Sequence, residues 1–396
     1  PDSLCFPLPA AMATEARAAA VQQLQPLAPP SSKDVLPSPS ASMPTPNAPC
    51  GEASDPRDLP RLLKLGGAPP EGKPGACSPG STVASERDSA AALPEAPRIG
   101  LRCGRHQIPH PAKASYGGED ACFASEAGNA VGVADGVSEW GWRFGMNPRD
   151  FASQLMRGAQ AAVEGSGADA GAVGARERAA GALADGHAGV GAFGAATAIV
   201  AVLDPGQAQL GVASLGDSGL RLLRRAPGSS DVQVVAQTEE QQHAFNQPFQ
   251  LSKVPTVADF PRLVAEGKAA LVDAVRRCGQ VKQDRPGDAA LYEFPVQRGD
   301  LLLLASDGVF DNLHDAELCE IVAGATSGDD APDPSALAAA VANAAFSRSQ
   351  DPKADTPFSR KVKQAGHNRP GGNPDDITVV VAWVADRVDA RLDASP

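Results

Sequence analysis

The sequence is poor in aromatic residues and has no paired cysteines, no long apolar run and no excess of positive charge. Aromatic residues make up 4% of its 396 residues, and its seven cysteines lie far apart without C-x-x-C spacing. An odd, scattered set is typical of reduced thiols and argues against a disulfide framework or a cysteine-bound zinc ion. No apolar run approaches the roughly 18 residues of a transmembrane helix. The formal net charge of -12 argues against nucleic acid or an anionic membrane as the main partner.

Several common catalytic motifs are also missing. The six histidines lack zinc-ligand spacing, and the chain contains neither H-E-x-x-H nor a G-x-x-x-x-G-K-[ST] phosphate loop. No His-Ser or His-Cys constellation indicates nucleophilic catalysis by a side chain. The acidic residues are therefore the best candidates for chemistry.

Proline is concentrated at the start of the chain. Of the 36 prolines, 19 lie in the first 100 residues, in serine-rich segments such as PLAPPSSKDVLPSPSASMPTPNAP. This density prevents regular helix or sheet, because proline fixes φ and lacks a backbone N–H. We therefore expect residues 1–97 to be largely disordered, residues 98–388 to form one folded domain, and residues 389–396 to form a short tail.

The expected folded domain combines apolar strand patterns with helical patterns. Strand patterns that end at Gly, Asp or Pro cover residues 121–127, 129–137, 195–204, 208–225, 289–296, 300–310 and 377–384. Helical patterns cover residues 148–163, 314–323 and 334–346, whereas the Gly/Ala-rich stretches 164–192 and 324–333 are interpreted as loops or weak helix. Strands adjacent in sequence and helices gathered in runs predict an α+β sandwich with largely antiparallel sheets.

Acidic residues stand at the ends of several of these strands. The strands ACFAS and NAVGVA flank a short turn containing Gly128 and Asn129, which predicts a β-hairpin. If the turn is centred between Ala127 and Gly128, Asp120 lies opposite Asp135, with their Cβ atoms about 4.5–5.5 Å apart. Two carboxylates this close repel each other, so we expect positive charge beside them.

Three further segments repeat this arrangement. Asp307 follows the apolar run LLLLAS, and Asp375 and Asp376 come just before the strand ITVVVAWV. If these strands run antiparallel, both sets of acids lie at one edge of a sheet. Asp217 closes another apolar strand in SLGDSG. A single Asp-Gly pair usually marks only a turn, but four or five acids at the same kind of strand end indicate a shared site.

Oxygen-rich sites of this kind suit Mg²⁺ or Mn²⁺. Two such ions that share one carboxylate can hold a hydroxide between them at neutral pH and bind a phosphoryl group for in-line attack. Gly136, which follows Asp135, has no side chain, so its carbonyl oxygen is free to turn towards a metal ion. The residues themselves therefore predict a divalent-cation site that acts on a phosphoryl group.

Five motifs in a fixed order resemble the metal-dependent (type 2C, PPM) protein serine/threonine phosphatases. They are GGEDA, GVADGV, GDSG, SDGVFDNL and DDITVVVA, and the resemblance covers about residues 105–385. The branch of the family found in mitochondria and plastids is the most similar. Its likeness extends to HAFNQPFQL (243–251), to DRPGDA (284–289), and to TPFSRKVKQAG before GGNPDDITVVVA.

The resemblance implies a four-layer α-β-β-α sandwich, in which two mainly antiparallel sheets are flanked by helices and a dimetal cleft lies at one sheet edge. It implies that Asp135 bridges two metal ions, that Gly136 supplies a carbonyl ligand, and that Asp307 and Asp375 bind one of the ions. Asp375 is preferred to Asp376 because the family motif has Asn at the second position.

Three more acids take roles by the same resemblance. Glu119 would lie near the second metal ion, Asp120 would order its bound water, and Asp217 would contact a third, weaker metal ion. The implied activity is hydrolysis of phosphoserine and phosphothreonine in proteins by a metal-bridged hydroxide at two Mg²⁺ or Mn²⁺ ions, without a covalent intermediate. We expect phosphorylated proteins as partners, a monomer, and a mitochondrial or chloroplast location, with the cytoplasm as the alternative.

Two positions depart from the family pattern. Many members have an arginine four residues before the Glu, where it binds the substrate phosphate, but this chain has Ser115 there. Lys113 is the nearest cation and is either its substitute or a solvated surface residue. Many members also have Asp-Gly-His, with the His as a candidate general acid, but here Val137 follows Gly136. The proton for the leaving serine or threonine oxygen then comes from metal-bound water, or none is needed if the transition state is loose. His106, His110 and His187 are either substitutes for the family His or ordinary loop residues.

Two other functions remain as alternatives. The missing Arg and His would suit a catalytically silent scaffold that binds a phosphoprotein, although all the expected metal-binding acids are present. A small-molecule phosphatase would use the same chemistry on a different substrate.

Overall fold

The computed structural model describes residues 99–165, 173–278, 283–326 and 333–386. The segment 1–97, expected to be disordered, and the expected tail 389–396 lie outside the described residues, as do most of the stretch 164–173 and residues 327–332.

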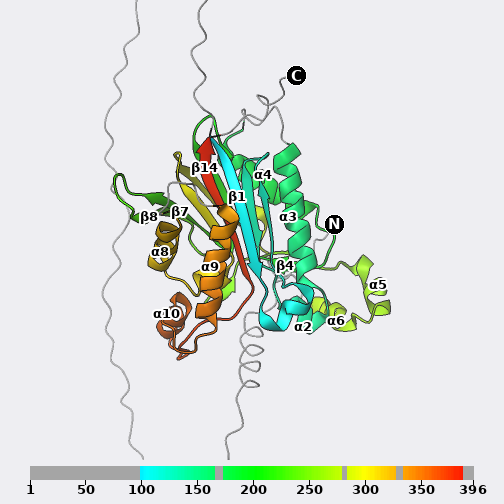
Figure 1. The fold of residues 1–396 in the computed structure, drawn as a ribbon. Helices are drawn as coiled ribbons and strands as arrows, with labels where there is room; N and C mark the ends of the chain where they lie inside the picture. Colours follow the sequence, from blue (N-terminus) through cyan, green and yellow to red (C-terminus); the bar gives the residue numbers. More distant parts are fainter. Residues whose placement is uncertain (1–98, 166–172, 279–282, 327–332, 387–396) are drawn as a thin grey trace, which may run out of the picture. The chain divides into compact units, whose positions relative to one another are not determined.

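Ten strands form two five-stranded antiparallel sheets (Figure 1). The first sheet has the order β12 (Ala290–Pro295), β6 (Gln209–Leu215), β5 (Ala198–Asp204), β3 (Ala130–Ala134) and β2 (Ala121–Ser125). The second sheet has the order β1 (Ile99–Ile108), β14 (Ile377–Asp386), β13 (Leu301–Ala305), β7 (Gly219–Arg225) and β8 (Val232–Gln237). Two short pairs are added, β4 (Gly194–Ala196) with β11 (Leu251–Lys253) and β9 (Gln242–Ala244) with β10 (Gln247–Pro248).

The two sheets pack face to face because their central strands are apolar on both faces. In β5, Ile199, Ala201 and Leu203 belong to the core between the sheets, whereas Val200 and Val202 belong to the core beneath the helices of the first sheet. The same alternation runs along β13 and β14 of the second sheet. A strand that is buried on both faces has a continuous apolar sequence, and β5, β13 and β14 show this pattern.

Helices cover the outer face of each sheet. The first sheet packs against α3 (Pro148–Gly165) and α4 (Ala175–Ala188), and the second against α8 (Asp315–Ala325) and α9 (Pro334–Ser349), which lie on opposite sides of the sandwich (Figure 1). The predicted α-β-β-α sandwich is therefore confirmed. Among the described helices, none combines the length and the apolar character needed to cross a membrane.

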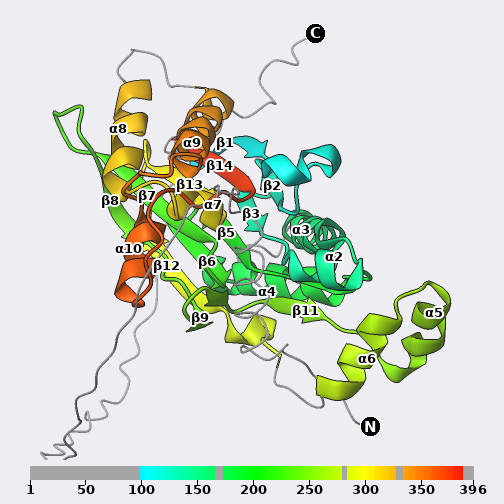
Figure 2. The same cartoon turned by 90° about the horizontal axis from the view of Figure 1, so that it is seen from below.

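Shorter helices surround one end of the sandwich. They are α2 (Glu139–Phe144), α5 (Phe260–Ala265), α6 (Ala269–Cys278), α7 (Asp307–Phe310), α10 (Pro357–Gln364) and the 3-10 turns η1 (Pro111–Tyr116), η3 (Val257–Asp259) and η4 (Pro286–Asp288). A separate apolar cluster that includes Trp140, Phe193 and Leu263 joins α2 to α5 and α6, which extend from one side of the sandwich (Figure 2).

Within residues 164–192, interpreted from the sequence as loops or weak helix, residues Ala175–Ala188 form the helix α4. Its Gly/Ala content reflects close helix packing: a Cβ on Gly186 would lie 2.7 Å from the carbonyl oxygen of Leu155 in α3, and one on Gly158 would lie 2.8 Å from the Cα of Gly186. Glycine has low helix propensity, but here it lets the two helix backbones approach each other. Strands β1 and β8 were missed, because both are edge strands with half-polar patterns.

Candidate active site

The hairpin of β2 and β3 brings two acids together at its open end. Ala121 pairs with Ala134, so Asp120, which precedes β2, and Asp135, which follows β3, lie side by side as predicted. The register is set by the turn, where Asn129 takes a positive φ of 47°. Asp120 is almost fully buried. The hairpin therefore carries its two carboxylates to the same edge of the first sheet.

The second sheet supplies further acids at a corresponding edge. Strands β13 and β14 run antiparallel, with Ala305 opposite Val379, so Asp307 after β13 lies across from the start of β14. The backbones meet closely there, since a Cβ on Gly308 would collide with the carbonyl oxygen of Asp376. The expectation that these strand ends share an edge is confirmed.

The pKa values show that acids from both sheets face one another. Burial is the largest cause that raises the pKa of Asp135 well above its usual range, and the carboxylates of Asp120, Asp307, Asp375 and Asp217 raise it further. Burial and most of the same neighbours also raise the pKa of Asp307. Burial raises the pKa of Asp120 to about 7. Without a cation, these carboxylates cannot all be ionised together.

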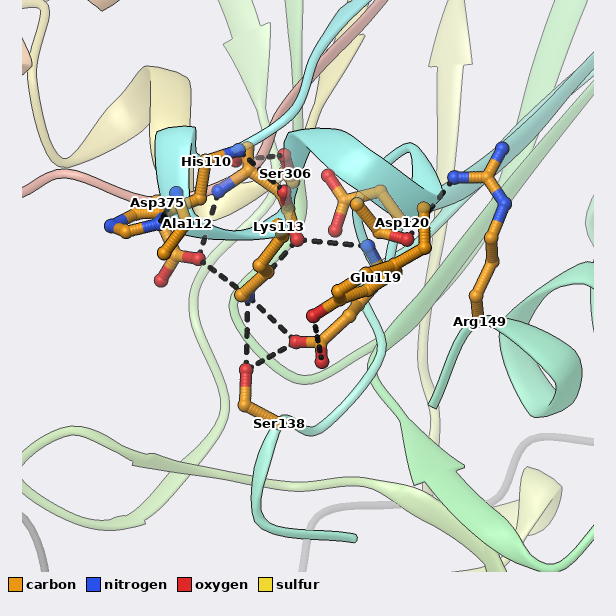
Figure 3. Close-up of polar contacts among 12 residues, drawn as sticks. His110, Ala112, Lys113, Glu119, Asp120, Ser138, Arg149, Ser306 and Asp375 are labelled. Carbon is orange, nitrogen blue, oxygen red and sulfur yellow. Dashed lines mark hydrogen bonds and ion pairs between the residues drawn. The ribbon is translucent and has the colours of Figure 1, made fainter. Parts of the chain in front are cut away.

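Lys113 lies among the acids on one flank of this group (Figure 3). Its Nζ is 2.6 Å from Glu119 Oε2, 3.0 Å from Asp376 Oδ2 and 3.4 Å from Asp375 Oδ1. It also donates a hydrogen bond of 3.0 Å to Ser138 Oγ. Burial opposes the charge on Lys113, but Asp375, Asp376 and Glu119 raise its pKa above the usual value. Lys113 is thus a largely buried, ion-paired cation, with 15% of its side chain exposed, rather than a solvated surface residue.

Asp376 fixes the loop that carries Lys113 and Glu119. Its buried carboxylate accepts hydrogen bonds from the backbone N–H groups of His110, at 2.7 Å, and Glu119, at 2.9 Å. The sequence reasoning set Asp376 aside in favour of Asp375, and a contact across 257 residues gives no local signal. Arg149 was also missed; it donates to the carbonyl oxygen of Gly117 from the start of α3, on the other side of Glu119 and Asp120 (Figure 3).

Asp217 lies in the turn between β6 and β7. Burial raises its pKa to about 7, with Asp311 and Glu240 as the next causes. Lys361 of α10 lies 3.2 Å from Asp311 and also pairs with Glu240. A second lysine therefore lies near the acids, beside Asp311 and Glu240.

The arrangement fits a divalent cation by its unpaired oxygen atoms. Both carboxylate oxygens of Asp120 and the Oδ1 of Asp307 are buried without a donor in hydrogen-bonding geometry, although the hydroxyls of Ser306 and Thr378 lie near Asp120 and partly lower its pKa. Buried carboxylate oxygens without a donor are costly unless a cation compensates them. Over residues 99–165, 173–278, 283–326 and 333–386, no three His, Cys, Asp or Glu side chains already stand in metal-ligand geometry, so the fit rests on these unpaired oxygens and on the excess of acids.

Comparison with known proteins identifies the family. No protein-family model matches the chain. The chain is 34% identical over 276 residues to the Protein phosphatase PTC7 homolog of Homo sapiens, which covers 69% of this chain and 81% of that protein. It is 33% identical over 305 residues to Probable protein phosphatase 2C 26 of Arabidopsis thaliana, with 74% and 86% covered. The chain belongs to the type 2C protein phosphatase family.

A solved structure of the family agrees with this membership. The X-ray structure of the photosystem II phosphatase PBCP has a TM-score of 0.56 and 29% sequence identity, and it covers 72% of this chain and 99% of that one. The resemblance inferred from the five motifs is therefore confirmed. The relatives support a metal-dependent protein phosphatase and give no support to a silent scaffold or a small-molecule phosphatase.

The histidines considered as substitutes for the family His have other surroundings. His187 lies in α4, where its Nε2 is 3.1 Å from the carbonyl oxygen of Ser252. His110 caps η1, and its ring accepts a hydrogen bond from Ala112 N. His106 lies in β1, opposite Val379. Among the residues that the structure describes, none of these three side chains forms a hydrogen bond or an ion pair with the central acids, and His187 lies in the outer helix layer.

The raised pKa values predict that the metal-free protein loses stability as the pH rises. Asp120 and Asp217 have pKa values of about 7, against about 3.8 when unfolded, so between these values the folded chain holds protons that the unfolded chain has released. Stability is then greatest at low pH and falls as the pH rises through 7, by an amount on the order of a few kcal/mol.

Thermal unfolding in excess chelator at pH 5.0, 6.0, 7.0 and 7.5 measures this effect. We expect the unfolding temperature to fall over this series and to recover when Mn²⁺ is added at pH 7.5. The acids whose pKa is lowered, such as Glu164 and Asp259, titrate below this range and do not obscure it. A metal-free unfolding temperature that rises from pH 5.0 to 7.5 would contradict the assignment of these acids to one repulsive cluster.

Proposed function

We propose that this chain hydrolyses phosphoserine and phosphothreonine in proteins, with two divalent cations, Mg²⁺ or Mn²⁺, held by the acids at the shared sheet edge. One observation carries the proposal. The chain belongs to the type 2C protein phosphatase family, and the strand ends of both sheets bring together acids with buried carboxylate oxygens that lack a hydrogen-bond partner.

The proposed roles follow from where each residue lies. Asp135, which has acidic neighbours from both sheets, is proposed to help hold both cations, and Asp307 and Asp375 are proposed to help hold one of them. Glu119 and the carbonyl of Gly136 are proposed for the other cation. Asp217 is proposed for a weaker third cation; its neighbour Asp311 already pairs with Lys361.

Bound cations would supply a nucleophile from water at neutral pH and neutralise charge on the phosphoryl group. The chain itself orients the reactants. Asp120, buried beside Asp135, is proposed to order a water molecule in the site and to accept a proton from it. Lys113 is proposed to contact the substrate phosphate, in place of the arginine that many family members carry. Val137 cannot donate a proton, so no side chain is assigned to the leaving group.

Membership of the family supports a class of substrate and a type of compartment. We propose phosphorylated proteins as substrates and a mitochondrial or chloroplast location. The second is supported by the resemblance to the organelle branch and by the photosystem II phosphatase among the solved relatives. Imaging of the tagged full-length protein tests the location, and a cytoplasmic distribution would overturn it.

Phosphate release from synthetic peptides tests the activity. We expect Mn²⁺- or Mg²⁺-dependent release from phosphoserine and phosphothreonine peptides, loss of release with EDTA, and much slower release from a panel of phosphorylated metabolites. Faster turnover of a metabolite would make the chain a small-molecule phosphatase. No release from any substrate with either metal ion present would overturn the proposal.

A further inference from the structure

The ammonium group of Lys113 occupies a position surrounded by oxygen atoms. Three carboxylates and one hydroxyl lie within 3.4 Å of Nζ, and Glu119 is the nearest at 2.6 Å. The side chain of Lys113 is only 15% exposed, and that of Glu119 only 4%. Ser138 Oγ also donates a hydrogen bond to the same Glu119 oxygen. The side chains form a partly buried cation site that the protein fills with its own lysine.

Hydrogen bonds hold the backbone on either side of this lysine, whereas the side chain is held by the polar contacts of Nζ. Lys113 N donates to the carbonyl oxygen of His110 at 2.7 Å, and Gly118 N donates to that of Lys113 at 3.3 Å. Asp376 holds the same loop through His110 N and Glu119 N. The four-carbon stem of lysine is flexible, so Nζ can leave while the loop stays in place.

The three acids differ in the hydrogen bonds that they keep once the ammonium group leaves. Asp376 keeps its two backbone donors and therefore tolerates the loss of Lys113. Glu119 Oε2 and Asp375 Oδ1 do not have two such donors and need another positive charge. A divalent cation at Glu119 would lie close to Nζ, where two positive charges repel.

We propose that Lys113 competes with a divalent cation for Glu119 and Asp375, so that loading of the Glu119 side of the site requires the ammonium group to be displaced. This inference rests on the proposed function, because it assumes that Glu119 faces a metal ion. Lys113 is then a determinant of metal affinity in this chain. Its release on metal loading would also free the ammonium to contact the substrate phosphate.

Calorimetric titration of the chelator-treated full chain with Mn²⁺ alone tests the competition. Lys113→Met removes the charge and keeps most of the length, and it should tighten the weaker Mn²⁺ site at least tenfold. Lys113→Arg keeps a positive charge and should leave that site weak. Lys353→Met is the matched control, because Lys353 is exposed and its loss changes the net charge equally; it should change neither site more than twofold.

The outcomes separate this inference from the proposed function. If the wild type binds no Mn²⁺, the proposed function fails as well. If the wild type binds two ions and Lys113→Met binds them with equal or lower affinity, only the competition is overturned. If Lys353→Met increased the Mn²⁺ affinity to the same extent, the effect would come from net charge alone, and the competition would also be overturned.

Labelling of the wild-type protein gives a second readout that does not need a folded variant. An amine-acetylating reagent followed by mass spectrometry measures how accessible Lys113 is with and without Mn²⁺. We expect labelling of Lys113 to rise several-fold with Mn²⁺, while labelling of exposed Lys353 stays constant. Equal or lower labelling of Lys113 in the presence of Mn²⁺ would contradict the displacement.

Discussion

Asp135→Asn should reduce kcat/KM for a phosphoserine peptide by roughly 10³-fold or more. The amide has the same shape but removes the charge from the residue that faces acids of both sheets. Charge stabilisation at such a centre usually contributes several kcal/mol to the rate. The same change relieves repulsion in the metal-free protein, so its unfolding temperature in chelator should stay the same or rise. An inactive but equally stable variant is the expected result.

Asp185→Asn is the matched control for this variant. Asp185 is exposed on α4, in the outer helix layer, and the same chemical change there should leave kcat/KM within twofold. Near-wild-type activity of Asp135→Asn with metal present would remove Asp135 from the centre of the site. A large loss of stability would instead show that Asp135 has a structural role.

Gly136→Ala should lower activity about 10²-fold or more and also lower stability. A Cβ at this position would lie 2.6 Å from the carbonyl oxygen of Glu119 and 3.1 Å from that of Pro148. Both neighbours are backbone atoms, so the Glu119 loop or the start of α3 must shift. A displacement of about 1 Å at a catalytic site can cost 10²-fold in rate, and overpacking typically costs about 1–3 kcal/mol of stability.

This variant also separates two explanations for the glycine. The sequence suggested a free carbonyl oxygen as the reason for Gly136, whereas the structure adds the close approach of Glu119. Gly181→Ala is the control, because nothing lies within 4 Å of its Cβ position in α4, and it should stabilise the protein by about 0.5–1 kcal/mol. Wild-type activity and stability in Gly136→Ala would contradict the close approach.

The acids at strand ends were predictable because strand periodicity and turn chemistry are local. The turn at Gly128 and Asn129 places Asp120 beside Asp135 without any knowledge of the rest of the fold. The prediction that Asp307 and Asp375 share a sheet edge depended on antiparallel pairing of β13 with β14, and the observed register shows this pairing. Both inferences need only alternation of side chains and the direction of neighbouring strands.

The lysine among the acids was not predictable in the same way. Lys113 precedes Asp376 by 263 residues, and its contacts depend on a loop whose course no periodicity specifies. The sequence left open whether Lys113 was solvated or bound phosphate, and the structure gives a third answer, a buried ion pair. The choice between loop and weak helix for α4 stayed open for a related reason, since its glycines serve contacts with α3 that local propensity cannot show.

Anomalous diffraction at the manganese edge, from crystals of the wild-type chain grown with Mn²⁺, tests the central claim most directly. We predict two strong peaks between the sheet edges, both within ligand distance of Asp135, with Asp307 and Asp375 on one side and Glu119 on the other. The same crystals of Asp135→Asn should lose at least one peak. Peaks that lie away from Asp135, or no peak at this edge, would contradict the claim that these acids form a dinuclear metal centre.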